Sequence, residues 1–341
     1  MIYLHIGRHK TGTTSIQKYF HQHKNFFQKK NLVYFPTKDK SFAHHHYPYF
    51  LKEKRYSRDS RLLLSKEICK ITKENDKDFL ISSEDFQNIY PSNIKDIFNL
   101  TNHEITILIY LRDPVKYFIS SWKQYIHANY EVFSFKKYIN TKKELCMYIT
   151  FINQWRRFFE NVVVRNFEKD ALINNNLIHD FASIVSPNTK STDLPDLDYF
   201  SNKSLDNVTT LFKLNINNFV NKRKISIIRP GLLYNKMPDL FDQSKNFRDI
   251  QPFYLNEKSI SLMKFFSREA YKLESEIKRC KFEFNYIKTM ENFSVDESLA
   301  VLFLEKINYL EEINLLKKES KITKEAIYDF SNKFLQKIYN S

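Results

Sequence analysis

The scarcity of glycine is the feature that most constrains this chain. There are only 3 glycines in 341 residues, whereas average usage of about 7% would give roughly 24. A sequence this poor in glycine should keep it only where no other residue fits the backbone. Two of the three, Gly7 and Gly12, lie five residues apart, directly after an apolar run at 2–6. A tight loop is therefore predicted between them.

The residues around these glycines predict a strand, a loop and a helix in succession. Residues 2–6 predict a short buried strand, and residues 7–14 predict a loop. The spacing of Ile16, Tyr19 and Phe20 then gives the apolar stripe of a helix. This arrangement directs backbone N–H groups and a helix N-terminus toward an anion.

The rest of the chain predicts an α/β fold. Short apolar strands alternate with amphipathic helices, which indicates a parallel sheet covered on both faces. The further strands are predicted at 31–35, 79–81, 105–111 and 162–164, and helices at 52–74, after Pro114, at 143–159, at 203–221 and from Ser259 onward. We therefore predict a P-loop-like three-layer fold with a central, mostly parallel sheet over residues 1–285. Residues 286–341 are predicted to form a helical C-terminal extension.

Three polar segments follow three of the predicted strands. They are the glycine loop, Ser83-Glu84 and Arg112. In parallel sheets, ligands bind beyond the carboxyl ends of the strands. The sequence thus predicts that these three segments meet at one edge of the sheet.

Composition narrows the classes of partner. Lys and Arg exceed Asp and Glu to give a net charge of +15, which favours anionic partners, although an AT-rich genome would also inflate lysine. Three scattered cysteines argue against a disulfide framework or a cysteine zinc site. No zinc finger, RNP motif or recognition helix points to nucleic acid.

Location is predicted to be cytoplasmic. No apolar run approaches the roughly 18–20 residues of a membrane-spanning helix, and the N-terminus lacks the features of a signal peptide. The basic charge is compatible with peripheral membrane association. The C-terminal helices are compatible with an oligomer.

The glycine loop has the G-x4-G frame of a phosphate loop but departs from the Walker A pattern. That pattern requires lysine directly after the second glycine. Here Thr13 stands at that position, and Lys10 comes two residues before Gly12. The departure disfavours an ATP- or GTP-binding loop.

The segment Leu4–Gln17, with its Lys-Thr-Gly-Thr-Thr core, resembles the 5′-phosphosulfate loop of bacterial, carbohydrate-type sulfotransferases. Those enzymes use 3′-phosphoadenosine 5′-phosphosulfate (PAPS). Tyr110–Pro114, followed by Ser120, resembles the 3′-phosphate motif of the same family. Weaker similarity continues at 163–168 and 202–205, so the resemblance covers roughly residues 2–220.

The resemblance implies a role for each matching residue. Lys10 would stabilise the leaving group at the bridging oxygen, and Arg112 and Ser120 would bind the 3′-phosphate. Arg8 would either bind phosphate or sulfate, or remain solvated. The 5′-phosphate would be held by Thr11, Gly12, Thr13 and Thr14. A sulfuryl group carries less charge than a phosphoryl group, so no metal is expected to be required.

An acceptor hydroxyl or amine needs a general base. Glu84 is the first candidate, because it ends a buried strand on the predicted ligand edge. His44, His45 and His46 are the rivals, since imidazole has the better intrinsic pKa. The predicted catalytic set comprises Lys10, Glu84 and His46.

The sequence thus predicts a PAPS-dependent sulfotransferase acting by in-line displacement on a glycan or bacterial surface polysaccharide. Two alternatives from other classes are an atypical P-loop nucleotide kinase and a non-catalytic protein that binds anionic ligands. A degenerate sulfotransferase fold that binds nucleotide without catalysis is a third. The aromatic candidates for sugar stacking, each also a candidate core residue, are Tyr47, Tyr49, Trp122, Tyr125 and Tyr130.

Overall fold

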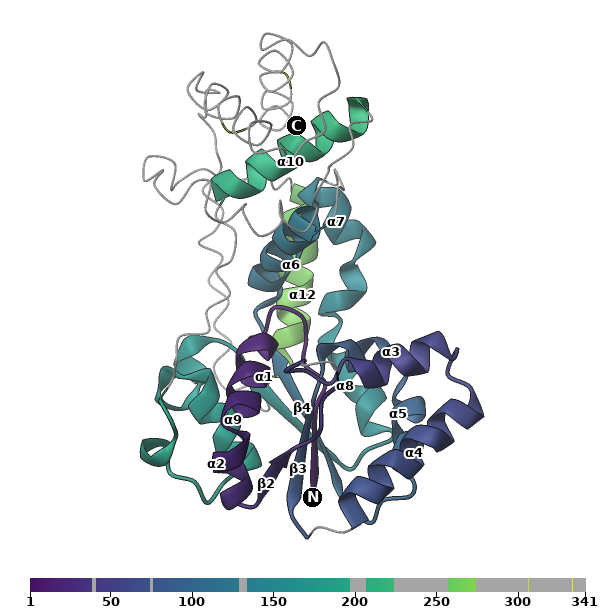
Figure 1. The fold of residues 1–341 in the computed structure, drawn as a ribbon. Helices are drawn as coiled ribbons and strands as arrows, with labels where there is room; N and C mark the ends of the chain where they lie inside the picture. Colours follow the sequence, from purple (N-terminus) through teal and green to yellow (C-terminus); the bar gives the residue numbers. More distant parts are fainter. Residues whose placement is uncertain are drawn as a thin grey trace. The chain divides into compact units, whose positions relative to one another are not determined.

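A computed structural model describes residues 1–38, 41–73, 76–128, 134–196, 207–223 and 257–273, together with Lys306 and Lys333 (Figure 1). The chain divides into two compact units. The first draws on Met1–Tyr117, Glu144–Asn202 and Phe265–Phe282, and the second on Phe118–Lys143, Lys203–Lys264 and Glu283–Ser341. The predicted extension at 286–341 lies outside the described residues except at two positions, so that boundary stays a prediction.

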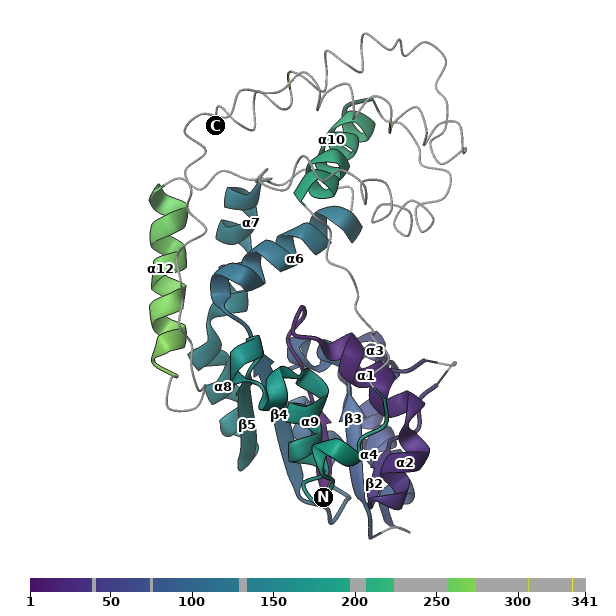
Figure 2. The ribbon, with the colours of Figure 1, turned by 90° about the vertical axis from the view of Figure 1, so that its left-hand side faces the viewer.

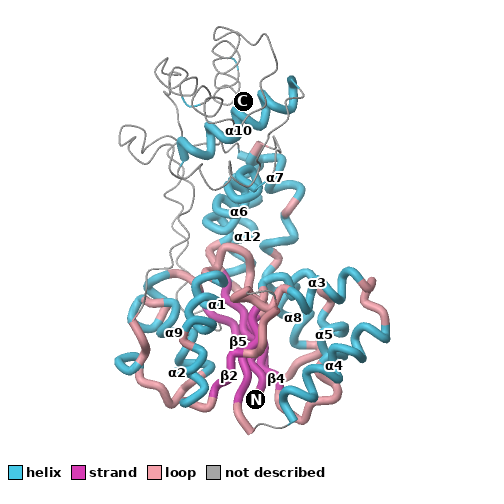
Figure 3. The backbone as a smooth tube through the Cα atoms, in the orientation of Figure 1, coloured by secondary structure: helices cyan, strands magenta, loops and turns pink. Residues whose placement is uncertain are grey.

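The first unit contains a five-stranded sheet, drawn in magenta in Figure 3. Its strands pair in the order β2-β3-β1-β4-β5, and all pairings are parallel. The strands are β1 (Ile2–His5), β2 (Leu32–Tyr34), β3 (Asp78–Ser82), β4 (Ile105–Leu111) and β5 (Asn161–Asn166). In the register of the sheet, Leu4 lies opposite Ile81 on one side and Ile107 on the other.

Helices cover both faces of this sheet, as two views at right angles show (Figures 1 and 2). One face carries α1 (Thr13–Gln22), α2 (Lys24–Lys29) and α9 (Leu177–Val185). The other carries α3 (His46–Glu53), α4 (Arg58–Lys73), α5 (Pro91–Ile97) and α8 (Tyr148–Arg156). The predicted α/β three-layer fold is confirmed.

The strand order creates a switch point at the carboxyl edge of the sheet. The chain leaves β1 toward β2 on one side, whereas it leaves β4 toward β5 on the other. Adjacent parallel strands whose connections diverge in this way leave a crevice beyond their carboxyl ends. The glycine loop follows β1 and Arg112 follows β4, so both lie at this point.

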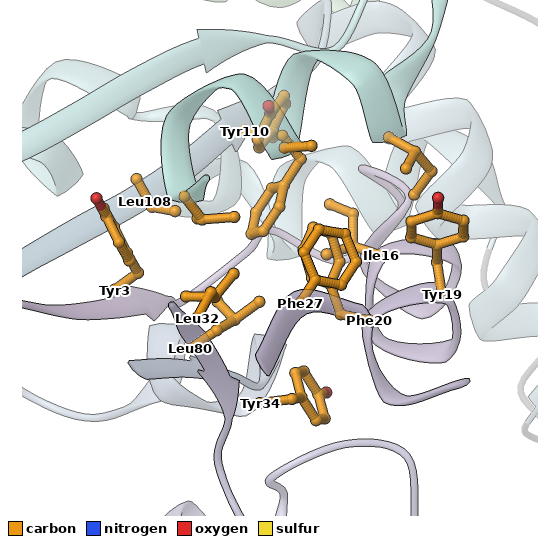
Figure 4. Close-up of a cluster of buried hydrophobic side chains, with 14 of the residues drawn as sticks. Tyr3, Ile16, Tyr19, Phe20, Phe27, Leu32, Tyr34, Leu80, Leu108 and Tyr110 are labelled. Carbon is orange, nitrogen blue, oxygen red and sulfur yellow. The ribbon is translucent and has the colours of Figure 1, made fainter. Parts of the chain in front are cut away.

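One apolar cluster lies between the sheet and α1, α2 and α9 (Figure 4). Tyr3 and Leu80 from the strands contribute to it, whereas Leu4 points to the opposite face because side chains alternate along a strand. The rings of Phe20 and Phe27 stack with their centroids 4.3 Å apart. These contacts fix α1, and hence the end of the glycine loop, against the sheet.

The structure corrects two predicted helices. The helix expected over 52–74 is interrupted between α3 and α4, where Arg55 and Tyr56 have positive φ angles of 50° and 56°. The helix expected over 143–159 consists of a 3₁₀ turn, η2 (Lys143–Cys146), and α8. No glycine or proline stands at residues 54–57 or at Met147, so the sequence pattern alone did not reveal these breaks.

The second unit contains α7 (Phe135–Thr141), α10 (Asn207–Arg223) and most of α6 (Pro114–Ala128) and α12 (Glu257–Tyr271). The buried Trp122 ring makes an edge contact with Phe135. Tyr47, in the first unit, is also buried. Burial of Tyr47 and Trp122 fits the core role rather than sugar stacking, and Tyr130 lies outside the described residues.

Among the described residues, no helix combines the length and the apolar character that crossing a membrane requires.

Replacement of Phe20 by alanine should lower the free energy of unfolding by about 3–5 kcal/mol, because a cavity would remain beside the Phe27 ring. Urea denaturation followed by circular dichroism measures this change. Leu63→Ala is the matched control, because Leu63 is 57% exposed on α4 and its loss should change stability by about 0.5 kcal/mol or less. Equal effects of the two substitutions would contradict the described core.

Candidate functional site

The loop after β1 has a left-handed backbone at three positions. The φ angles of Gly7, Lys10 and Gly12 are 49°, 67° and 74°. A Cβ atom on Gly7 would collide with Thr13 Cγ2. A Cβ on Gly12 would collide with the side chain of Leu177 and approach Phe167 Cε2 to 2.8 Å. Both glycines are therefore needed for their conformation and for close packing.

Thr11 stabilises the loop from inside. Its fully buried hydroxyl donates to the carbonyl of Arg8 at 2.6 Å and accepts the backbone N–H of Arg8 at 3.3 Å. The N–H of Thr11 donates to the same carbonyl. This hydroxyl therefore closes the loop, and a contact of Thr11 with a ligand would have to use other atoms.

The loop ends at the N-terminus of α1. Gly12 is the N-cap residue and provides no side-chain cap, and α1 begins at Thr13. The first N–H groups of any helix lack acceptors within the helix and carry a partial positive charge. The N–H groups at Thr13 and Thr14 are therefore oriented to bind an anion.

Lys10 and Arg112 place two cations at the switch point. Arg112 Nη1 donates to the Lys10 carbonyl at 3.5 Å, and its guanidinium lies 5.7 Å from the Phe167 ring centroid. Burial, followed by the charge of Arg112, lowers the pKa of Lys10. Across the part of the chain that the structure describes, neither cation pairs with a carboxylate, and the buried Nε of Arg112 has no hydrogen-bond partner.

Arg8 is buried rather than solvated, with 5% of its surface exposed. Its Nη2 donates to the carbonyl of Leu145 at 2.8 Å, and Nη1 donates to Gln87 Oε1 at 3.3 Å. The guanidinium lies 4.0 Å from the Phe151 ring centroid. Arg8 therefore ties the glycine loop to the neighbouring segments. Its burial excludes the solvated alternative, and binding of phosphate or sulfate by Arg8 stays a prediction.

The segment after β3 lies against the loop. Glu84 begins the 3₁₀ turn η1 (Glu84–Asn88), and its Cβ lies 3.4 Å from the place where a Cβ of Gly7 would stand. Glu84 Oε2 accepts a hydrogen bond from the buried Gln17 Nε2 at 2.9 Å. The structure thus brings Glu84, the glycine loop and Arg112 to one edge of the sheet, as predicted.

The three adjacent histidines have different environments. His44 is fully buried: its Nδ1 accepts the N–H of Ser82 at 3.0 Å, and its Nε2 donates to the carbonyl of Phe35 at 2.8 Å. Burial lowers the pKa of His44 to about 4. Both ring nitrogens are therefore used in the fold. His46 is half-buried at the start of α3, with its ring centroid 4.0 Å from that of Tyr47.

His45 forms a hydrogen-bonded pair with Asp85 that sequence analysis missed. Its Nδ1 lies 2.9 Å from Asp85 Oδ2 and 2.8 Å from Ser83 Oγ. The two partners are 40 residues apart in sequence, and no spacing rule links them. The only available signal was that Asp85 follows Glu84 on the predicted ligand edge.

Asp113 and Ser120 lie in and beside α6. Asp113 precedes the helix, and its Oδ1 accepts the N–H of Lys116 at 2.9 Å. Ser120 belongs to the second unit and is buried. Its hydroxyl has no hydrogen-bond partner among the residues described. Asp113 therefore starts the helix that carries Ser120.

The described residues contain no cluster of three or more histidine, cysteine or acidic side chains able to hold a metal ion.

The fold and site define an α/β protein with a candidate anion site at a sheet switch point. A scan against protein-family models finds no match to the chain. Searches of curated proteins and of solved structures also find none.

The free energy of unfolding should fall as the pH is lowered from 6.5 to 4. Unfolded His44 takes up a proton in this range, whereas folded His44 stays largely neutral until the pH nears 4. A shift from 6.5 to about 4 corresponds to about 3 kcal/mol. His5, buried on β1, contributes in the same direction. Urea denaturation across this range should therefore give a shallower slope for His44→Gln than for the wild type. Parallel curves would contradict the burial of a neutral imidazole.

Proposed function

We propose that this chain is a PAPS-dependent sulfotransferase. The observation that carries the proposal is the pair of cations, Lys10 and Arg112, beside a backbone anion loop at the switch point of the sheet. Two cations that act on each other electrostatically favour an anion between or beside them. A nucleotide that carries phosphate groups at both the 3′ and the 5′ position of its ribose supplies negative charge to Lys10 and to Arg112.

The 5′-phosphosulfate end would bind at the glycine loop. The N–H groups at Gly12, Thr13 and Thr14 would hold the 5′-phosphate, with Lys10 at the oxygen that bridges phosphorus and sulfur. Sulfuryl transfer breaks the bond between this oxygen and sulfur, so negative charge develops there. A lowered pKa makes the Lys10 ammonium a stronger proton donor to that oxygen.

The 3′-phosphate would bind at Arg112. Its guanidinium forms a planar fork that suits a phosphate, and its buried Nε lacks a partner among the described residues. Ser120 belongs to the second unit, so its predicted contact with that phosphate stays at the level of the sequence analysis. The unpartnered Nε of Arg112 supports the resemblance independently of the loop.

The identity of the acceptor stays a prediction from the sequence. The acceptor group is a hydroxyl or an amine, and the resemblance favours a glycan or bacterial surface polysaccharide. A cytoplasmic location, peripheral membrane association and oligomer formation also stay predictions. A bound metal is not part of the proposal, because lysine and backbone donors can stabilise the charge on a sulfuryl group.

Adenosine 3′,5′-bisphosphate should bind more tightly than ATP with Mg²⁺ in calorimetric titrations of the full chain. Arg112→Ala should weaken binding of the bisphosphate by about 10- to 100-fold, because hydrogen bonds to a charged group are lost. Arg157→Ala is the matched control, since Arg157 is exposed at the end of α8. Equal affinity for both nucleotides, or no effect of Arg112→Ala, would contradict the proposal.

Lys10→Ala should lower turnover of radiolabelled PAPS by about 100- to 1,000-fold while the protein still folds, because a donor to the developing charge is removed. Turnover is followed as labelled sulfate released to water or transferred to an added glycan. Lys24→Ala, which changes an exposed lysine on α2, should keep the wild-type rate. Wild-type turnover by the Lys10 variant would exclude this lysine from the chemistry.

A further inference from the structure

His45 and Asp85 form a pair of the kind that orients a basic imidazole. The carboxylate accepts the proton of His45 Nδ1 at 2.9 Å, which leaves the lone pair on Nε2. Ser83 Oγ lies 2.8 Å from the same Nδ1 and also accepts the N–H of Asp85 at 3.2 Å. The ring stacks on Tyr49 with an interplanar angle of 24°. The imidazole is therefore fixed by contacts at one nitrogen and one face.

This pair lies beside the glycine loop. Asp85 follows Glu84 in η1, which packs against Gly7. His9, the residue before Lys10, lies close enough for Glu84, Asp85 and His45 to act on its pKa. The pair and the loop therefore share the carboxyl edge of the sheet.

The charges around His45 favour a basic imidazole. Its pKa is raised, first by the hydrogen bond to Asp85 and also by the charge of Glu84, against the opposing effect of burial. Burial tends to raise the pKa of Asp85, but the hydrogen bond and charge of His45 outweigh it, so this pKa is lowered. The titratable groups that act on or adjoin His45 are Asp85, Glu84, His9, His44, His46 and Tyr49.

His44, His9 and Glu84 are less suited to the step than His45. His44 uses both ring nitrogens in backbone hydrogen bonds. Burial is the largest influence on His9 and lowers its pKa. Glu84 has one carboxylate oxygen engaged by Gln17, which holds it against α1.

We infer that His45 is the general base that deprotonates the acceptor hydroxyl, and that Asp85 is the positioning residue that orients it. The inference rests on the proposed sulfotransferase function. In the step, His45 Nε2 takes the hydroxyl proton while the hydroxyl oxygen forms a bond to sulfur. The bond between sulfur and the bridging oxygen breaks, and its electron pair stays on the phosphate of adenosine 3′,5′-bisphosphate.

The test uses the full chain with radiolabelled PAPS and water as the acceptor. His45→Gln should lower the rate of sulfate release by about 100- to 10,000-fold without weakening the binding of adenosine 3′,5′-bisphosphate. Glu84→Gln should lower the rate less than His45→Gln does, because Glu84 acts on the imidazole through its charge. The matched control is His103→Gln, because His103 contacts the Met1 amino group at the opposite edge of the sheet.

The pH profile separates a base from a structural residue. The acid limb of kcat/KM should disappear in His45→Gln and move to lower pH in Asp85→Asn, because loss of the carboxylate lowers the pKa of the imidazole. The His45 ring signal in a nuclear magnetic resonance titration should show the same downward shift in Asp85→Asn. This titration reports on the pair without any turnover.

The outcomes distinguish the two proposals. A wild-type protein that neither binds adenosine 3′,5′-bisphosphate nor turns over PAPS would overturn the proposed function, and the base assignment with it. If Lys10→Ala abolishes turnover but His45→Gln keeps the rate or the acid limb, the function survives and the base assignment fails. A large loss in Glu84→Gln with an active His45→Gln would transfer the role to Glu84.

Discussion

The left-handed backbone of the loop after β1 is the constraint on which the rest of the candidate site depends. Gly7 and Gly12 permit it, and side chains from other segments occupy the space that a Cβ would need at either position. The loop is therefore packed against η1, Phe167 and α9 rather than exposed as a free turn. This packing determines where Lys10 lies relative to the ends of β3 and β4.

The fold was predictable where burial acts on whole segments. All five strands were predicted, because parallel strands covered on both faces are continuously apolar and need no long-range information to be recognised. The breaks between α3 and α4 and at Met147 were not predicted. They depend on single backbone conformations, such as those of Arg55 and Tyr56, and neither residue is a glycine or proline that would mark a break in the sequence.

The site was predictable to the level of segments but not of partners. Strand ends in a parallel sheet share an edge, so the meeting of Glu84, Arg112 and the glycine loop followed from topology alone. The sequence could not show that neighbouring residues of the same type have different roles. It treated three adjacent histidines alike, whereas burial fixes His44 in the core and an acidic partner 40 residues away selects His45.

The pKa values of Lys10 and His45 are shifted in opposite directions by their surroundings. Burial and Arg112 lower the pKa of Lys10 from a high ordinary value, and the hydrogen bond to Asp85 raises that of His45 from a lower one. Environments that move a donor and an acceptor toward a common pH are what acid–base chemistry at neutral pH requires. In the proposed reaction, His45 accepts the proton of the acceptor hydroxyl, and Lys10 neutralises the negative charge that develops on the bridging oxygen. The same fold that partly buries the lysine therefore also gives the histidine its carboxylate.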